Sequence, residues 1–132
     1  MLARGVWWLL LRGNTGVGEA GGMTRLVGVT NAALGASPVN DYNPGNINAI
    51  NRLVLTMTGD TSLTGIVAPT LDGQLLLITN DDAVDTLTLP VESGTSTAAN
   101  RFFGITDIAV PPHASVLCCY DKSSLNRWVL IA

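Results

Sequence analysis

The chain has 132 residues, enough for one domain with appendages. Only 13% of the residues are charged and the formal net charge is −3, which argues against a basic nucleic-acid-binding protein. Hydrophobic residues make up 47% but aromatic residues only 5%, a balance of Leu, Val, Ile and Ala that is typical of β-structure. So few charges indicate that part of the surface is covered by partners.

Residues 1–22 combine an apolar run at residues 6–11 with a glycine-rich stretch at residues 13–22. The run is far shorter than the ~20 residues that span a bilayer. Three interpretations stay open: a cleaved signal, an upstream extension before a true start at Met23, or an apolar hook that docks on a neighbouring subunit. In the hook, Trp7 and Trp8 are the expected anchors.

Residues 23–50 are rich in Asn, Gly and Pro, which suit turns and extended backbone. We expect an extended arm here, either an unstructured linker or a tie that becomes ordered on a partner through main-chain pairing. Tyr42 is a candidate anchor within that tie.

Residues 51–132 show period-two alternation with a turn signal about every ten residues, which predicts about eight short strands. Regular spacing of this kind favours an all-β fold, a small antiparallel β-sandwich or jelly-roll-like knob. The expected strands cover residues 52–58, 62–68, 74–79, 85–89, 98–103, 107–110, 114–120 and 127–131.

Two of these strands, near residues 74–78 and 128–132, are apolar on both faces. A small sandwich has one inner layer, so the second face must meet something else, and a copy of the same chain is the simplest candidate. The expected subunit-interface residues are Leu75, Leu77, Trp128, Val129 and Ile131.

Little in the chain indicates catalysis or metal binding. His113 is the single histidine and is expected in a turn, with Ser115 nearby but no surrounding motif. Residues 80–85 gather three carboxylates without the spacing of a calcium loop. Cys118 and Cys119 are adjacent in one strand, so their side chains face opposite ways and a disulfide between them is not expected. We expect no enzyme activity, no catalytic residue, no cofactor and no metal.

Residues 50–132 resemble a β-domain that recurs in virion proteins of tailed bacteriophages. The segments that carry the resemblance are Arg52-Leu-Val-Leu-Thr, Gly65-Ile, Asp72-Gly73, Leu76-Leu-Ile-Thr-Asn80, Leu87-Thr-Leu89, Ser96-Thr-Ala-Ala-Asn-Arg-Phe102, Ala114-Ser-Val-Leu, Tyr120-Asp121 and Arg127-Trp128. The resemblance implies a compact homotrimeric knob on a fibre, spike or capsid decoration protein, fixed to the virion by an N-terminal segment. The chain is expected to depart from long tail fibres in having no coiled coil, β-helix or repetitive shaft, which favours a small capsid-surface protein.

The resulting hypothesis is a structural virion protein, made in the host cytoplasm, that decorates or cements the capsid surface. Its expected partners are its own copies and the major capsid protein or another virion protein, with no nucleic acid and no membrane. Residues 1–50 would tie the knob to the capsid, with Trp7, Trp8 and Tyr42 as anchors. The alternative is the receptor-binding tip of a tail or head fibre, which recognises a cell-surface glycan. A small β-barrel enzyme and a secreted non-viral trimer are further alternatives.

Overall fold

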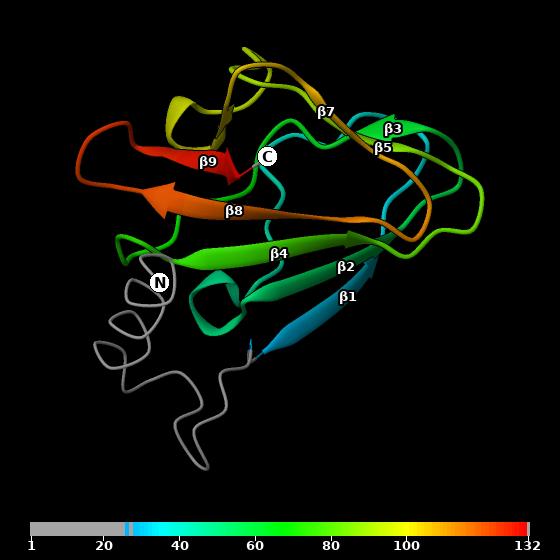
Figure 1. Ribbon diagram of the computed structural model, residues 1–132, viewed down its shortest axis with the longest axis horizontal. Coiled ribbons are helices and arrows are strands. Elements are labelled where there is room, and N and C mark those ends of the chain that lie inside the picture. Colours follow the sequence, from blue (N-terminus) through cyan, green and yellow to red (C-terminus); the bar gives the residue numbers. More distant parts are fainter. Residues whose placement is uncertain (1–25, 27, 132) are drawn as a thin grey trace, which may run out of the picture.

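The computed structural model describes residue 26 and residues 28–131. These residues form a β-solenoid of about four turns, in which strands of successive turns stack mostly in parallel (Figure 1). No helix in this part of the chain is long and apolar enough to cross a membrane.

The described strands form two sheets, and the connections between them include two single-turn 3-10 helices, η2 (Ile47–Ala49) and η3 (Ala98–Asn100). The larger sheet contains, in spatial order, β1 (Val29–Ala33), β2 (Arg52–Thr56), β4 (Leu75–Asn80), β8 (Ser115–Asp121), β9 (Arg127–Ile131) and β6 (Phe102–Phe103). The smaller sheet contains β3 (Thr61–Ser62), β5 (Leu87–Leu89) and β7 (Ile108–Val110).

The first three turns repeat with a nearly constant length. Val29 of β1 pairs with Arg52 of β2, and Arg52 pairs in the same way with Leu77 of β4. Away from the large sheet, Tyr42 bridges in parallel to Ile66. Each of these pairs joins positions about two dozen apart in the chain, a period that is typical of solenoid repeats. Each strand therefore contacts the strand one full turn away, which is the defining arrangement of a solenoid.

The final turn runs in the opposite direction. β8 pairs with β4 in antiparallel fashion, and β7 does the same with β5. β9 then returns antiparallel to β8, and β6 lies parallel to β9 at the end of the sheet. The reversal adds strands beyond β4 and so protects its second edge.

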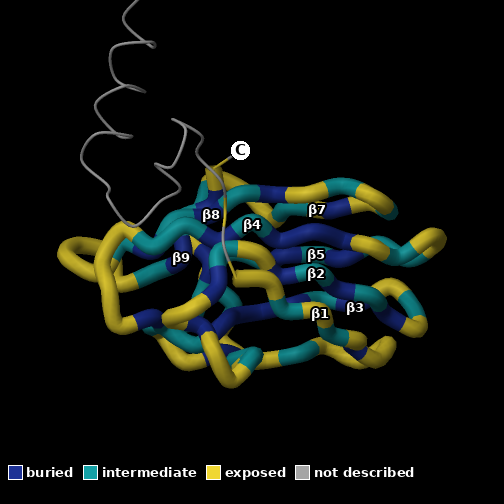
Figure 2. The backbone as a smooth tube through the Cα atoms, turned by 90° about the horizontal axis from the view of Figure 1, so that it is seen from below, coloured by how far each residue is buried: buried dark blue, intermediate teal, exposed yellow. Residues whose placement is uncertain are grey.

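The core is built from inward side chains that line up from strand to strand. Leu53, Ile78 and Val116 occupy one such row, in direct register across β2, β4 and β8. The first two of these side chains have no solvent exposure, and Val116 is 8% exposed. A second row joins the large, fully buried side chains of Tyr120, Trp128 and Phe102, which are direct partners across β8, β9 and β6. In Figure 2 the buried stretches of the backbone lie mainly along the strands, and the exposed stretches lie mainly at the bends.

The expected antiparallel sandwich or jelly-roll knob with an extended N-terminal arm is wrong, and so is the expectation that the chain contains no β-helix. Several strands were located correctly, including β2, β4, β8 and β9, but their partners were not. One-sided alternation looks the same in a sandwich and in a solenoid wall, because each buries one face of every strand. Residues 29–50, expected in the arm, form β1, the turn after it and η2, which together make the first turn of the solenoid.

Candidate functional site

The outer face of the large sheet carries two aligned rows of apolar side chains. In one row Leu77, Leu117 and Ile131 are direct partners across β4, β8 and β9. The parallel row joins the four strands β4, β8, β9 and β6 through the residues Leu75, Cys119, Val129 and Phe103. We call these seven residues the outer apolar face. All seven are at least partly exposed, with Phe103 at 38% and Ile131 at 51%.

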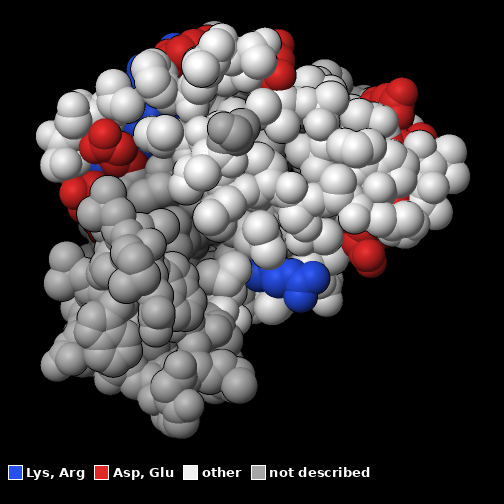
Figure 3. All heavy atoms as spheres, in the orientation of Figure 1, with Lys and Arg blue, Asp and Glu red and all other residues white. Residues whose placement is uncertain are grey.

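Polar groups border the outer apolar face at both ends of the strands. Thr79 and Ser115 pair across β4 and β8, and their hydroxyl oxygens lie 2.9 Å apart in a hydrogen bond. At the opposite end Asp121 pairs with Arg127. No charged side chain belongs to the two apolar rows themselves. In the view of Figure 3, charged side chains lie mostly toward the outline of the molecule and uncharged ones fill the centre. An apolar centre with a polar border is the usual anatomy of a protein interface.

The structure brings four of the five expected interface residues together. Leu75, Leu77, Val129 and Ile131 all belong to the outer apolar face. Trp128 does not, because it alternates with Val129 and points inward, where it has no solvent exposure. Sequence reasoning missed Leu117, Cys119 and Phe103. The signal for Leu117 and Cys119 was present in the chain, since both alternate with the inward residues Val116 and Cys118.

The expected anchors lie elsewhere or outside the described residues. Trp7 and Trp8 belong to the part that the structure does not describe. Tyr42 is half-buried and packs against the core, and its backbone N–H donates to the Gly65 carbonyl at 2.9 Å. Burial raises the pKa of its hydroxyl. Tyr42 is therefore a structural part of the first turn.

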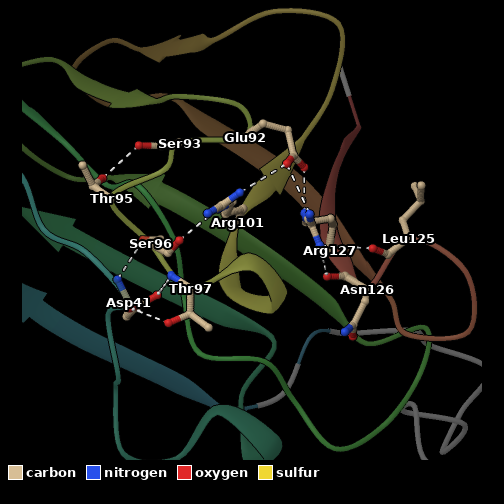
Figure 4. Close-up of polar contacts among 10 residues, drawn as sticks. All are labelled: Asp41, Glu92, Ser93, Thr95, Ser96, Thr97, Arg101, Leu125, Asn126 and Arg127. Carbon is tan, nitrogen blue, oxygen red and sulfur yellow. Dashed lines mark hydrogen bonds and ion pairs between the residues drawn. The ribbon is translucent and has the colours of Figure 1, made fainter.

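A polar cluster ties the first solenoid turn to the long connection between β5 and β6 (Figure 4). Asp41 accepts hydrogen bonds from the Thr97 backbone N–H at 2.8 Å, the Thr97 hydroxyl at 3.0 Å and the Asn100 amide at 2.9 Å. The Asn100 bond, with those from Thr97, holds the pKa of Asp41 below its usual value. The Ser96 hydroxyl accepts the Asp41 backbone N–H in return.

Arg101 lies in the same region. Its guanidinium is 3.8 Å from Glu92 and also donates from Nε to the Ser96 carbonyl at 2.9 Å. Arg127 binds the same carboxylate more closely, with Nε to Oε1 at 2.7 Å. The two arginines thus share one glutamate within the subunit. Because the pairs are partly exposed, each contributes little to stability.

The residues considered for chemistry have different environments. His113 is exposed in a turn with a positive φ of 61°. The Ser115 hydroxyl is occupied by Thr79. Both cysteines are free thiols, Cys118 facing inward and Cys119 outward, and burial raises the pKa of each. Across residue 26 and residues 28–131, no group of three or more His, Cys, Asp or Glu side chains is placed to hold a metal ion.

Among the three carboxylates of residues 80–85, that of Asp82 has a structural role. Its carboxylate accepts backbone N–H bonds from Met57 at 3.1 Å, Val84 at 2.9 Å and Asp85 at 3.0 Å. These bonds tie the second turn to the third and lower the pKa of Asp82 from 3.8 to about 2, the Asp85 bond being the largest cause. A carboxylate that gathers several N–H donors is stabilised in its charged form.

This carboxylate predicts a specific acid sensitivity. Because the pKa of Asp82 is depressed in the folded state, its contribution to stability is complete above about pH 3.8 and is lost as the pH falls toward 2. We expect the free energy of unfolding of the Asp82→Ala variant to depend less on pH between 2 and 4 than that of the unchanged chain. Urea titrations at several pH values measure it. The exposed neighbour Asp81 provides a control, and an identical slope in Asp81→Ala and Asp82→Ala would contradict the assignment.

No family model matches the chain, and no curated protein or solved structure matches it. The class that the structure defines is a small β-solenoid with a reversed last turn and an apolar outer sheet face.

Proposed function

We propose that this chain is a structural virion protein, a capsid decoration protein of a tailed phage that works as a homotrimer. The observation that carries the proposal is the outer apolar face, which offers seven uncharged, partly exposed side chains on four adjacent strands. Contiguous apolar surface of this kind marks an interaction site on a soluble protein. Copies of the same chain supply matching apolar surfaces, and three copies arranged around one axis would cover all three faces.

The proposal is also supported by the nature of the scaffold. Its strands are short and its connections are held by side-chain bonds to the backbone, such as those of Asp41 and Asp82. A protein that binds only the assembled shell stabilises the shell by mass action. The capsid tie was expected in residues 1–50, but residues 29–50 form a solenoid turn, so the proposal rests on the outer apolar face.

The trimer is tested by light scattering on the purified chain. We expect a native mass of about three times 13.8 kDa. Leu117→Lys places a charge at the centre of the outer apolar face and is expected to give a folded monomer. Ser115→Lys is the matched control, because Ser115 lies on the same strand and the same side, two positions away, but in the polar border. A monomeric unchanged chain, or a trimeric Leu117→Lys variant, would sink the assembly role.

The virion location is tested by immunogold electron microscopy with antibodies raised against the purified chain. The particles are tailed phages produced by a host that carries this coding sequence. Label on the heads is the expected result. Label confined to tail tips would replace decoration by the receptor-binding alternative, and unlabelled particles would contradict both.

A further inference from the structure

One of the two apolar rows on the outer side of the large sheet continues past the outer apolar face and reaches a single cation. Beyond Leu77 the direct partners in this row are Arg52 of β2 and Val29 of β1. Arg52 is exposed, and no ion pair joins its guanidinium to a carboxylate among the described residues. Its neighbours on both sides are aliphatic, so its stem can lie on apolar surface while the charged head stays available to a partner.

A shallow depression of about 410 Å³ lies on the same side of the sheet, over the ends of β1 and β2. The Asp81 N–H donates to the Leu55 carbonyl at 2.8 Å, which continues the parallel ladder between β2 and β4 by one residue. Because side chains alternate along a strand, that of Asp81 points outward, as those of Leu77 and Thr79 do. The residues that line the depression are Asn31, Ala32, Ala33, Val54, Thr56 and Asp81.

The walls of the depression carry oxygen acceptors that suit a guanidinium. Asp81 offers a carboxylate, Asn31 an amide oxygen and Thr56 a hydroxyl, and the remaining lining residues are small and apolar. None of these three side chains makes a hydrogen bond to another residue in the part of the chain that the structure describes. An arginine head has five N–H donors and no acceptor, so a carboxylate beside two further acceptors is its natural complement.

Arg52 does not fill the depression of its own subunit. It pairs laterally with Leu77, and Asp81 lies four positions further along the same side of the sheet. Four positions correspond to roughly 13 Å along a strand, which is beyond the reach of a direct ion pair between these two side chains. Each copy of the chain therefore carries a cation and its complementary acceptor site at separate places on one face.

We infer that Arg52 of one copy enters the depression of the next copy and pairs there with Asp81. The inference rests on the proposed trimer and names the residues that orient its copies. A contact between two different places on one face can repeat head-to-tail and closes into a ring when the rotation fits. An exposed pair adds little to the stability of a single chain, but like charges in its place oppose association.

Charge reversal tests the pair, with sedimentation velocity over a dilution series as the measurement. Arg52→Asp places a carboxylate at both positions, and Asp81→Arg places a guanidinium at both. Each is expected to raise the concentration at which half of the trimer dissociates by more than about tenfold. The double variant Arg52→Asp/Asp81→Arg restores opposite charges at every contact and is expected to return that concentration close to the unchanged value.

Asp85→Arg is the matched control for Asp81→Arg. It makes the same change of charge four residues away, at a carboxylate that does not line the depression, and should leave trimer dissociation unchanged. Circular dichroism of each variant separates a loss of assembly from a loss of folding.

Mixing the two single variants in equal amounts distinguishes a ring of three from a two-fold pair. In a ring of three at most two of the three contacts can join opposite charges, so the mixture is expected to assemble less tightly than the double variant. In a two-fold dimer both contacts would be satisfied, and the mixture would recover completely.

The outcomes separate the inference from the proposed function. An unchanged chain that is not trimeric would contradict both. A trimer whose two single charge reversals dissociate no more readily than the unchanged chain would overturn the inference alone. A double variant as weak as the single variants, or a complete recovery on mixing, would also overturn the head-to-tail pair.

Discussion

Trp128→Ala is expected to lower the free energy of unfolding by about 3–5 kcal/mol, the range for removing a large aromatic side chain from a core. Trp128 has no solvent exposure and packs edge-to-face on Tyr120, with ring centroids 5.1 Å apart. Its indole N–H donates to the Ile66 carbonyl at 3.0 Å and so joins β9 to the connection after β3. Since small domains are stable by only about 5–15 kcal/mol, this one change removes much of the total.

The measurement is urea unfolding followed by circular dichroism, at one protein concentration so that assembly does not shift the midpoint. Trp128→Phe keeps an aromatic ring but leaves the Ile66 carbonyl without its donor, and is expected to cost about 1–3 kcal/mol. Ile105→Ala is the control, because Ile105 is fully exposed and its loss should change stability by less than about 0.5 kcal/mol. A Trp128→Ala variant as stable as Ile105→Ala would contradict the assignment of this residue to the core.

Asp41→Ala is expected to destabilise the fold by about 2–3 kcal/mol, because one carboxylate satisfies three donors from the connection between β5 and β6. Asp41 also has a positive φ of 47°, which alanine adopts poorly. Asp41→Gly separates the two effects, since glycine accepts this backbone conformation but lacks the carboxylate. The glycine variant should therefore recover part of the loss and remain clearly less stable than the unchanged chain.

The control for Asp41 is another aspartate with a single backbone partner. Asp107 accepts one hydrogen bond, from the Val91 N–H at 2.9 Å, and Asp107→Ala is expected to cost about 0.5–1.5 kcal/mol. Thermal and urea unfolding of the three variants provide the comparison. If Asp41→Gly unfolds at the same urea concentration as the unchanged chain, the carboxylate does not hold the connection.

The sequence located much of the local structure and part of the candidate surface. Alternation predicted β2, and short apolar runs between turn signals predicted β4, β8 and β9. The two runs that are apolar on both faces, β4 and β9, indicated an outer surface in need of cover. Four expected interface residues, Leu75, Leu77, Val129 and Ile131, lie together for that reason. Trp128 was misassigned because size and hydrophobicity alone do not tell an inward position from an outward one.

Strand partners were decided by the tertiary structure. Alternation reports which side of a strand is buried, and this is a local property with a period of two. Whether the neighbour is the next strand along the chain or one a full turn away depends on the path of the connections. Here the connections send Val29 to Arg52 and Arg52 to Leu77 in parallel, and then reverse so that Leu77 meets Leu117 in antiparallel fashion.

The sequence by itself therefore determined that this is an all-β chain with low charge and surplus apolar surface, because composition and alternation depend on single residues and their near neighbours. Only the tertiary structure decided that residues 29–50 form a turn rather than an arm, and that seven apolar side chains from four strands share one face. Those features depend on pairings between residues that are far apart in the chain, such as Val29 with Arg52. Such pairings are selected by the packing of the whole core and leave no local pattern in the sequence.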